Sequence, residues 1–256
     1  GYRVILNRVK DYIASTGKDL FLTTENPGDA HIDGCDAFLI WNPRQDTEVP
    51  MMTSVYSGYT LYYASNHTTG EGMQSFVMAQ ARDFLWGSQL GWMPPEIPEP
   101  FRGYLKKLGK LRVQTRKFLT YGELVGMPRN TAPDEIRGSS DEMMRKREES
   151  IAKVSANWPF FGTPKIATLP AVMSALWRAE DGHLGLFIMN LSEVKQSYCC
   201  AFDPPAYGLT SERLRYTRIQ ENGPGDSFEV QGGVQVRSED LEPFGGVVYD
   251  IGPAGT

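Results

Sequence analysis

The chain has few of the residue types that build metal, redox and disulfide-based sites. Its 256 residues contain three histidines and three cysteines, which are Cys35, Cys199 and Cys200. An odd number of cysteines with two adjacent thiols is not a disulfide framework, and no spacing matches a zinc site. One histidine and two aspartates within residues 31–36 are a weak ligand set for any ion. We therefore predict no metal site and expect the thiols to be small buried hydrophobic groups.

The chain also lacks strong net charge, long apolar runs and phosphate-binding glycine motifs. A net charge of -5 gives no reason to expect nucleic acid or an anionic membrane as a partner. No apolar run approaches the length of a membrane span and no signal peptide is visible, so the localisation stays open. Because neither G-x-G-x-x-G nor G-x-x-x-x-G-K follows a predicted strand, we expect no nucleotide, and no other cofactor is predicted.

What remains is the composition of a globular protein, with 41% hydrophobic and 22% charged residues. The chain begins at Gly1 and enters a helical pattern at once, with no capping residue before it. A protein rarely starts in the middle of its own pattern. We therefore expect a fragment, or a processed chain, of a longer protein.

The first half of the chain alternates helical and strand patterns. Apolar residues at helical spacing predict a helix from Tyr2 to Thr16, with Gly17 as its C-terminal cap. Short apolar runs predict strands at 20–24 and 37–41 and a third within 49–63. Two further helical patterns cover 73–90 and 101–119. This order of elements predicts an α/β region.

The second half of the chain follows a different pattern. From about residue 158, seven short apolar runs follow one another, separated by turn sequences such as "EDGH" and "ENGPGD". No helical pattern lies between them, which predicts an antiparallel β-sandwich. We therefore divide the chain into an α/β region at 1–140, a linker at 141–157 and an all-β domain at 158–256.

Three segments of the first half resemble the closing portion of a (β/α)8 barrel in bacterial glycoside-hydrolase-like proteins: "LTTENPGDAHIDGCDAFLIW", "VPMMTSVYSGYTLYY" and "ARDFLWGSQLGWM". This family is distantly similar to α-galactosidases and endo-α-N-acetylgalactosaminidases. The tail "EDLEPFGGVVYDIG" is similar to the last strands of the sandwich that follows such barrels. The resemblance implies the C-terminal part of a TIM-type (β/α)8 barrel plus an antiparallel β-sandwich. Because a complete barrel needs about 250 residues, roughly its first four or five strands would be missing here.

The resemblance also implies hydrolysis of glycosidic bonds in oligo- or polysaccharides, with a carbohydrate as the substrate. Glycosidases need two carboxylic acids, and in such barrels the chemistry lies at the carboxyl ends of the strands. Glu25 ends the run "LFLTTE", so by this analogy it is the general acid/base. The alternative is a strand-end glutamate that hydrogen-bonds a neighbouring loop.

Candidate substrate-binding residues come from the same segments. Asp33 can reach the rim of the cleft from the loop after Glu25. Aromatic rings stack on the apolar faces of sugars, and the best-placed rings are Trp41, Tyr56, Tyr59 and Trp92. Core packing explains aromatic residues in strands equally well. Asp36 precedes a predicted strand, so we expect it to orient the backbone instead.

Two other functions stay open. Because only one catalytic carboxylate is apparent, the chain can be a module that binds glycans without cleaving them, or a structural scaffold. An incomplete barrel exposes unpaired strand edges and apolar faces. We therefore expect self-association, or association with the missing N-terminal part.

Overall fold

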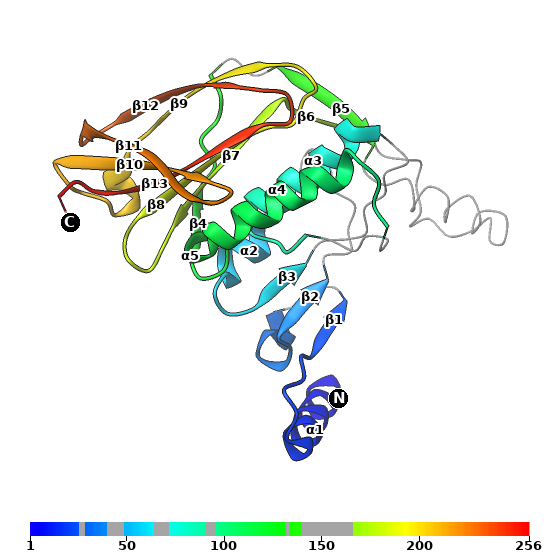
Figure 1. The fold of residues 1–256 in the computed structure, drawn as a ribbon. Coiled ribbons are helices and arrows are strands. Elements are labelled where there is room, and N and C mark those ends of the chain that lie inside the picture. Colours follow the sequence, from blue (N-terminus) through cyan, green and yellow to red (C-terminus); the bar gives the residue numbers. More distant parts are fainter. Residues whose placement is uncertain are drawn as a thin grey trace.

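The computed structural model of the protein describes residues 1–25, 29–39, 49–63, 72–90, 96–131, 134–139 and 166–255. A region of helices and parallel strands is followed by antiparallel sheets (Figure 1). The helices are α1 (Tyr2–Thr16), α2 (Met51–Tyr56), α3 (Gly72–Leu85), α4 (Phe101–Gln114) and α5 (Arg116–Leu119), with 3-10 turns η1 (Asp29–Gly34) and η2 (Pro204–Tyr207). The strands are β1 (Thr23–Glu25), β2 (Ala37–Leu39), β3 (Leu61–Tyr63), β4 (Glu123–Gly126), β5 (Glu135–Ser139), β6 (Ile166–Pro170), β7 (Val172–Arg178), β8 (Leu184–Asn190), β9 (Gln196–Phe202), β10 (Arg213–Gln220), β11 (Gly223–Gln231), β12 (Gln235–Leu241) and β13 (Gly246–Pro253). None of the described helices is long and apolar enough to span a membrane.

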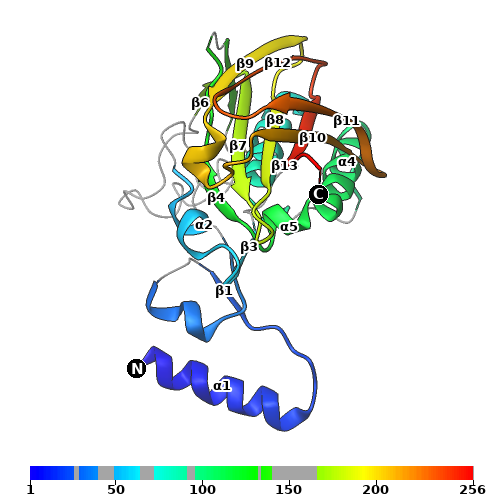
Figure 2. The same cartoon turned by 90° about the vertical axis from the view of Figure 1, so that its left-hand side faces the viewer.

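The predicted N-terminal helix is confirmed as α1. Gly17 ends it in the left-handed conformation at a φ of 63°, and its N–H donates to Ala14 O at 3.2 Å. Leu6 is the buried residue of α1, and it belongs to a small apolar cluster with Phe38 and Tyr62 of the neighbouring strands. Figure 2 shows α1 at the opposite end of the molecule from the antiparallel sheets, with the parallel strands between them. Much of the apolar surface of α1 is therefore exposed.

The strands β1, β2 and β3 form a parallel sheet in that order. The pairing places Glu25 beside Leu39, and Leu39 beside Tyr63. After α3 the chain returns to this sheet, where Gln89 pairs with Tyr63 and its N–H donates to Tyr62 O at 2.6 Å. We call residues 87–89 the return segment. Together, β3, α3 and the return segment form the β-α-β connection that parallel strands require.

The prediction of a third strand within 49–63 is wrong over most of that range. Met51–Tyr56 forms α2, and only Leu61–Tyr63 is a strand. Tyr56 therefore ends a helix and Tyr59 lies in the turn that follows, instead of in a strand as predicted. The reason is spacing, because Met52 and Tyr56 are one helical turn apart and both pack against the small apolar cluster. A short apolar run does not distinguish a helix from a strand by itself.

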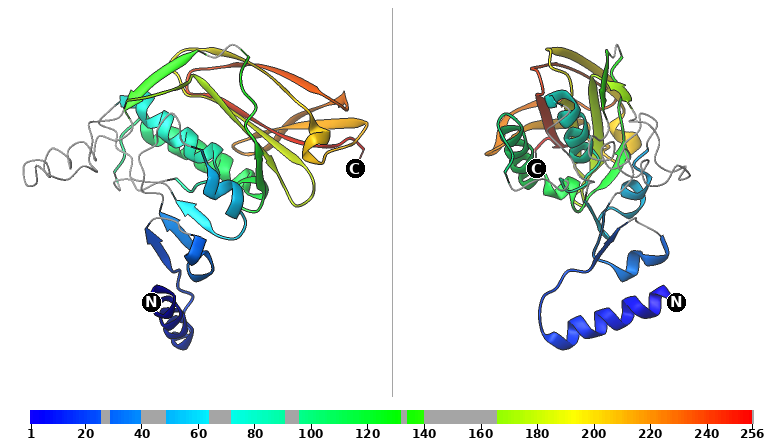
Figure 3. Two further views of the ribbon diagram at one scale, coloured as in Figure 1. Left: turned by 180° about the vertical axis from the view of Figure 1, so that it is seen from behind. Right: turned by 90° about the vertical axis from the view of Figure 1, so that its right-hand side faces the viewer.

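The helices α3 and α4 run in the same direction and pack against each other. Near their beginnings Phe76 meets Phe101 edge-on, with 5.1 Å between ring centroids, and Arg112 reaches the residues that follow α3. Both predicted helices are confirmed, but each is shorter than expected. The second one breaks at Thr115, whose hydroxyl donates to a carbonyl one turn back at 2.8 Å. Both helices lie between the parallel sheet and the antiparallel sheets (Figure 3).

The seven runs predicted as strands in the second half are confirmed as β7 to β13. One antiparallel sheet has the order β11-β10-β13-β8-β7-β4, and β12 pairs with β9 in a second sheet. The two faces of the larger sheet bury different residues of β8. Leu186 and Ile188 join the core with β9 and β12, while Phe187 and Met189 join the core with α3 and α4. The larger sheet is thus the middle of three layers.

Two strands before residue 140 pair with strands of the second half. β4 pairs with β7, and β5 pairs with β6. The sequence patterns predicted none of β4, β5 and β6. The boundaries at 1–140, 141–157 and 158–256 stay predictions, and residues 140–165 lie outside the described part of the chain.

The turn after α3 requires a glycine. Gly87 has a φ of 73°, and a Cβ there would lie 2.6 Å from Trp177 Cη2. We expect Gly87→Ala to lower the free energy of unfolding by about 1–3 kcal/mol, because a left-handed alanine is strained and the indole ring must move.

The matched control is Gly109→Ala inside α4, where an added Cβ meets no atom within 4 Å. The free energy of unfolding of this variant should be about 0.5–1 kcal/mol higher than that of the wild type, because alanine is the better helix former. Urea unfolding followed by circular dichroism measures both changes. Equal effects of the two substitutions would contradict the assigned role of Gly87.

Candidate active site

The carboxyl ends of the parallel strands bring three side chains into one row. Glu25, Leu39 and Tyr63 are the last residues of β1, β2 and β3, and the register places them side by side. Residues that pair across a sheet point to the same face. Because neighbouring strands lie about 4.8 Å apart, the Cα atoms of Glu25 and Tyr63 are about 10 Å from each other. We call these three residues the carboxyl-end row.

The carboxyl-end row points away from the helices that cover the sheet. Phe38 and Tyr62 precede two members of the row along their strands, and their rings stack with 6.2 Å between centroids. Both rings pack with residues of α1 and α2. Because side chains alternate along a strand, Glu25 lies on the opposite face of the sheet. The side chain of Glu25 is exposed, and that of Tyr63 is half-buried.

The segment after α3 is held beside this row by Arg112 of α4. The guanidinium donates to Gln89 Oε1 at 3.0 Å, to Ser88 O at 3.0 Å and to Gly87 O at 2.8 Å. Burial lowers the pKa of Arg112 to about 10, while the nearby Asp83 carboxylate acts in the opposite direction. The planar fork of arginine thus satisfies the carbonyl groups beyond the end of α3 and holds the return segment in place.

The structure places Asp33 against α1. Its carboxylate accepts a hydrogen bond from Arg3, and its main-chain oxygen accepts one from Lys10 Nζ at 2.7 Å. Asp33 comes shortly before β2 begins, so it lies near the amino end of that strand and not in the carboxyl-end row. Asp36 orients the backbone, as expected. Its carboxylate accepts a hydrogen bond from Leu22 N at 2.7 Å, and its own N–H donates a hydrogen bond to Leu22 O at 2.8 Å.

The described aromatic candidates are not gathered in the row either. Tyr56 packs from α2 into the small apolar cluster, and Tyr59 is 83% exposed in the turn before β3. Both therefore precede the amino end of β3. Trp41 and Trp92 lie outside the described residues. Substrate binding by Asp33 and these four aromatic residues stays a prediction.

Tyr63 is the member of the row that sequence patterns missed. A single strand through 49–63 favours Tyr56 and Tyr59 as sugar contacts, whereas a strand that ends at Tyr63 places this residue at the carboxyl end. The sequence contains one signal for that end, because the turn-rich segment "ASNHTTGEG" begins directly after Tyr63.

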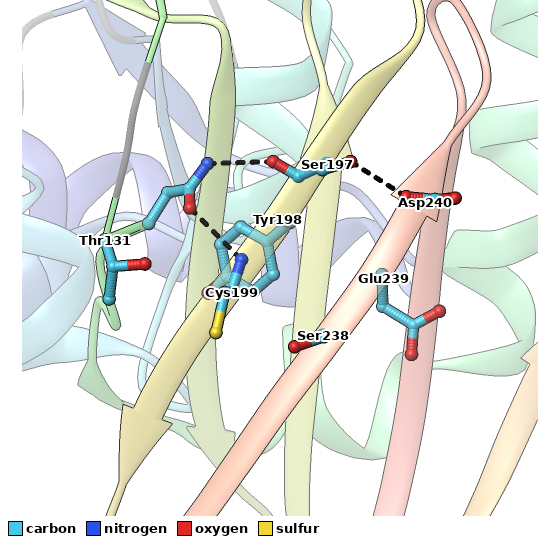
Figure 4. Close-up of a pocket in the computed structure, with 8 residues that line it drawn as sticks. Thr131, Ser197, Tyr198, Cys199, Ser238, Glu239 and Asp240 are labelled. Atoms are coloured by element: carbon cyan, nitrogen blue, oxygen red, sulfur yellow. Dashed lines mark hydrogen bonds between the residues drawn. The ribbon is translucent and has the colours of Figure 1, made fainter.

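A pocket of about 410 Å³ lies beside β9 and β12, away from the carboxyl-end row, and Figure 4 shows its polar lining. Asn130 Nδ2 donates to Ser197 O at 3.2 Å, and Asn130 Oδ1 accepts from Cys199 N at 3.1 Å. Ser197 Oγ donates to Asp240 at 2.8 Å. Tyr198 lines the pocket but is buried in the core, so its ring is not available for stacking on a sugar. This arrangement is better explained as bonding that joins two strands to the segment beside them.

A second pocket, of about 360 Å³, lies between α3 and the start of β7. Its lining includes Arg82 and Trp86, with 4.7 Å between the guanidinium carbon and the ring centroid. Both side chains are buried. Within the described ranges, no cluster of three or more histidine, cysteine, aspartate or glutamate residues is arranged to hold a metal ion.

Comparison with known proteins shows which proteins this chain is similar to. No protein-family model matches the chain. A curated protein of Bacteroides thetaiotaomicron, described as "putative glycoside hydrolase", is 25% identical over 206 residues, which cover 75% of this chain and 26% of that protein. Among solved structures, α-galactosidase I from Mortierella vinacea has a TM-score of 0.55 and 8% identity, over 99% of this chain and 64% of that one.

These relatives confirm the resemblance to glycoside-hydrolase-like proteins. At 8% identity, the likeness to α-galactosidase I shows the fold alone. A region of helices and parallel strands followed by antiparallel sheets is thus the architecture of this chain. The chain spans 26% of the length of the curated relative, and less than two thirds of the solved enzyme at 64%.

Arg112 should be essential for holding the return segment beside β3. We expect Arg112→Met to lower the free energy of unfolding by about 3 kcal/mol, because one buried and two partly buried acceptors lose a charged donor. Lys106→Met, on the exposed side of α4, is the matched control and should change stability by less than about 0.5 kcal/mol. Chemical unfolding of both variants measures the difference. A small effect of Arg112→Met would show that the segment is held by other contacts.

Proposed function

We propose that the chain is the C-terminal part of a glycoside hydrolase and that Glu25 is the general acid/base of its active site. The observation that carries this proposal is the position of Glu25 at the carboxyl end of a parallel strand, on the face opposite the covering helices. In a (β/α)8 barrel the helices cover the outside, and the carboxyl ends of the strands hold the active site. Glu25 then points into the barrel at its catalytic end.

In this proposal the parallel sheet corresponds to late strands of a (β/α)8 barrel, and the antiparallel sheets correspond to the C-terminal β-sandwich. Two observations support the assignment. Gln89 continues the sheet beyond β3 after a helix, and β1 pairs on one side only within the described part of the chain. The other side of β1 then receives the preceding strand of the full-length barrel. The fold shared with α-galactosidase I agrees with this reading.

The chemistry requires two carboxyl groups. Protonated Glu25 donates its proton to the glycosidic oxygen as the bond to the anomeric carbon breaks. A second carboxylate attacks that carbon or activates a water molecule. Leu39 and Tyr63 occupy the remaining places of the carboxyl-end row, so this second carboxylate comes from outside the row. Trp41 and Trp92 follow β2 and Gln89 in the sequence, and we propose both as contacts for the sugar rings.

A non-catalytic carbohydrate-binding or structural module is the second candidate. It is favoured by the single carboxylate of the row, because a general acid alone does not complete a glycosidase site. Glycan-array binding by the full-length protein, measured together with the release of reducing sugar, separates the two functions. Binding without release would support the module.

We expect Glu25→Gln in the full-length protein to abolish hydrolysis without affecting folding. The test substrate is melibiose, an α-galactoside chosen from the name of the structural relative, whose sugar leaving group needs a proton. Loss of the proton donor should lower kcat by about 100- to 10,000-fold. With 4-nitrophenyl α-D-galactopyranoside the loss should be smaller, because the nitrophenolate leaves without protonation.

The control for this experiment is Glu180→Gln, an exposed glutamate in the turn between β7 and β8, which should keep the normal kcat. Thermal unfolding of both variants shows whether the fold is retained. Near-normal turnover of melibiose by Glu25→Gln would remove Glu25 from the mechanism.

The 256-residue chain alone should self-associate. Ile5 of α1 and Phe21 before β1 are 59% and 62% exposed, and association buries such residues. Light scattering should therefore give a mass above that of the monomer. Ile5→Lys combined with Phe21→Lys should shift the chain toward the monomer.

A matched control uses apolar residues of the antiparallel part. Val234 and Val236 are 68% and 69% exposed there, so replacing both with lysine also removes two exposed apolar side chains. This double variant should associate like the wild type. A stable monomer for the wild-type chain would argue against an open barrel edge.

A further inference from the structure

We infer that Tyr63 contacts the sugar bound at Glu25 and forms a wall of the same subsite. This inference rests on the proposed function and extends it, because it names a substrate-contacting residue that the sequence patterns did not predict. The observation behind it is the register of the parallel sheet, in which both residues align with Leu39.

The register places the two side chains on one face and at one end of the sheet. Glu25 pairs with Leu39, and Leu39 pairs with Tyr63, so the two outer residues of the row are two strands apart. That separation is about 10 Å between their Cα atoms. Two long side chains at this spacing can touch opposite sides of one bound ring. Leu39 between them has no polar side-chain atom, so the phenol and the carboxylate are the polar groups of the row.

The direction of the Tyr63 side chain is set by its neighbours. Tyr62 is 3% exposed and points to the other face, where its ring stacks on Phe38. On the far side of β3, Gln89 pairs with Tyr63 and is itself held by Arg112. A shift of one residue would bury Tyr63 and expose Tyr62, which the packed aromatic pair opposes.

The chemistry of tyrosine suits this position. The face of a phenol ring covers the apolar C–H surface of a pyranose, and its hydroxyl bonds to a sugar hydroxyl. Tyr63 is half-buried, so part of the ring is supported by the protein and part remains open to a ligand. Tyr59, by contrast, is almost fully exposed before the amino end of the same strand.

The test compares Tyr63→Leu and Tyr63→Phe with the wild type in the full-length protein, using melibiose and 4-nitrophenyl α-D-galactopyranoside. We expect Tyr63→Leu to lower kcat/KM by about tenfold for both substrates, because it removes the stacking face. Tyr63→Phe keeps the ring, and its kcat/KM should fall by about threefold because the hydroxyl is missing. Tyr121→Leu, an exposed tyrosine after α5, is the matched control and should leave kcat/KM unchanged.

The outcomes separate this inference from the proposed function. If Glu25→Gln loses melibiose turnover while folded Tyr63→Leu stays within twofold of the wild type, the inference is overturned and the proposed function stands. If Tyr63→Leu does not fold, Tyr63→Phe decides: a loss of threefold or more supports the contact, and an unchanged kcat/KM overturns it. If the wild type releases no sugar from these substrates or from any other α- or β-glycoside, both proposals fail together.

Discussion

The end of α3 is the point on which both halves of the molecule depend. Trp177 of β7 donates from Nε1 to Leu85 O at 2.9 Å, and Arg112 of α4 donates to Gly87 O at 2.8 Å. These donors satisfy carbonyl groups that a helix end leaves without a partner inside the helix. One donor comes from the antiparallel sheet and the other from the adjacent helix, so α3 is attached to both. From this turn the chain passes directly to Gln89 and the parallel sheet.

The direction of the proposed catalytic carboxylate follows from strand pairing. Tyr63 aligns with Leu39, and Leu39 aligns with Glu25, so a one-residue shift of any of these strands would turn its member of the carboxyl-end row toward the helices. The stacked rings of Phe38 and Tyr62 prevent this error, because the shift would remove them from their apolar cluster. Core residues of the neighbouring strands thus decide where Glu25 points.

Local patterns predicted the elements whose structure depends on local spacing. These include α1 and the seven strands β7 to β13, and also the strand predicted at 20–24, which the structure shows at Thr23–Glu25. The burial of Cys35 and Cys200 was also predictable, and burial raises the pKa of both thiols, whereas Cys199 is partly exposed. The sequence did not predict β5, because its partner β6 lies beyond residue 165 and strand propensity does not encode a distant partner. Tyr63 was missed because an apolar run that is part helix and part strand has no single period.

A crystal structure of the full-length Glu25→Gln variant with melibiose tests the central claim most directly. We expect the glycosidic oxygen within hydrogen-bonding distance of the residue-25 side chain, and the sugar ring on the face of the parallel sheet opposite α1 and α2. A sugar bound at the amino ends of the strands, or a residue-25 side chain turned toward those helices, would contradict it.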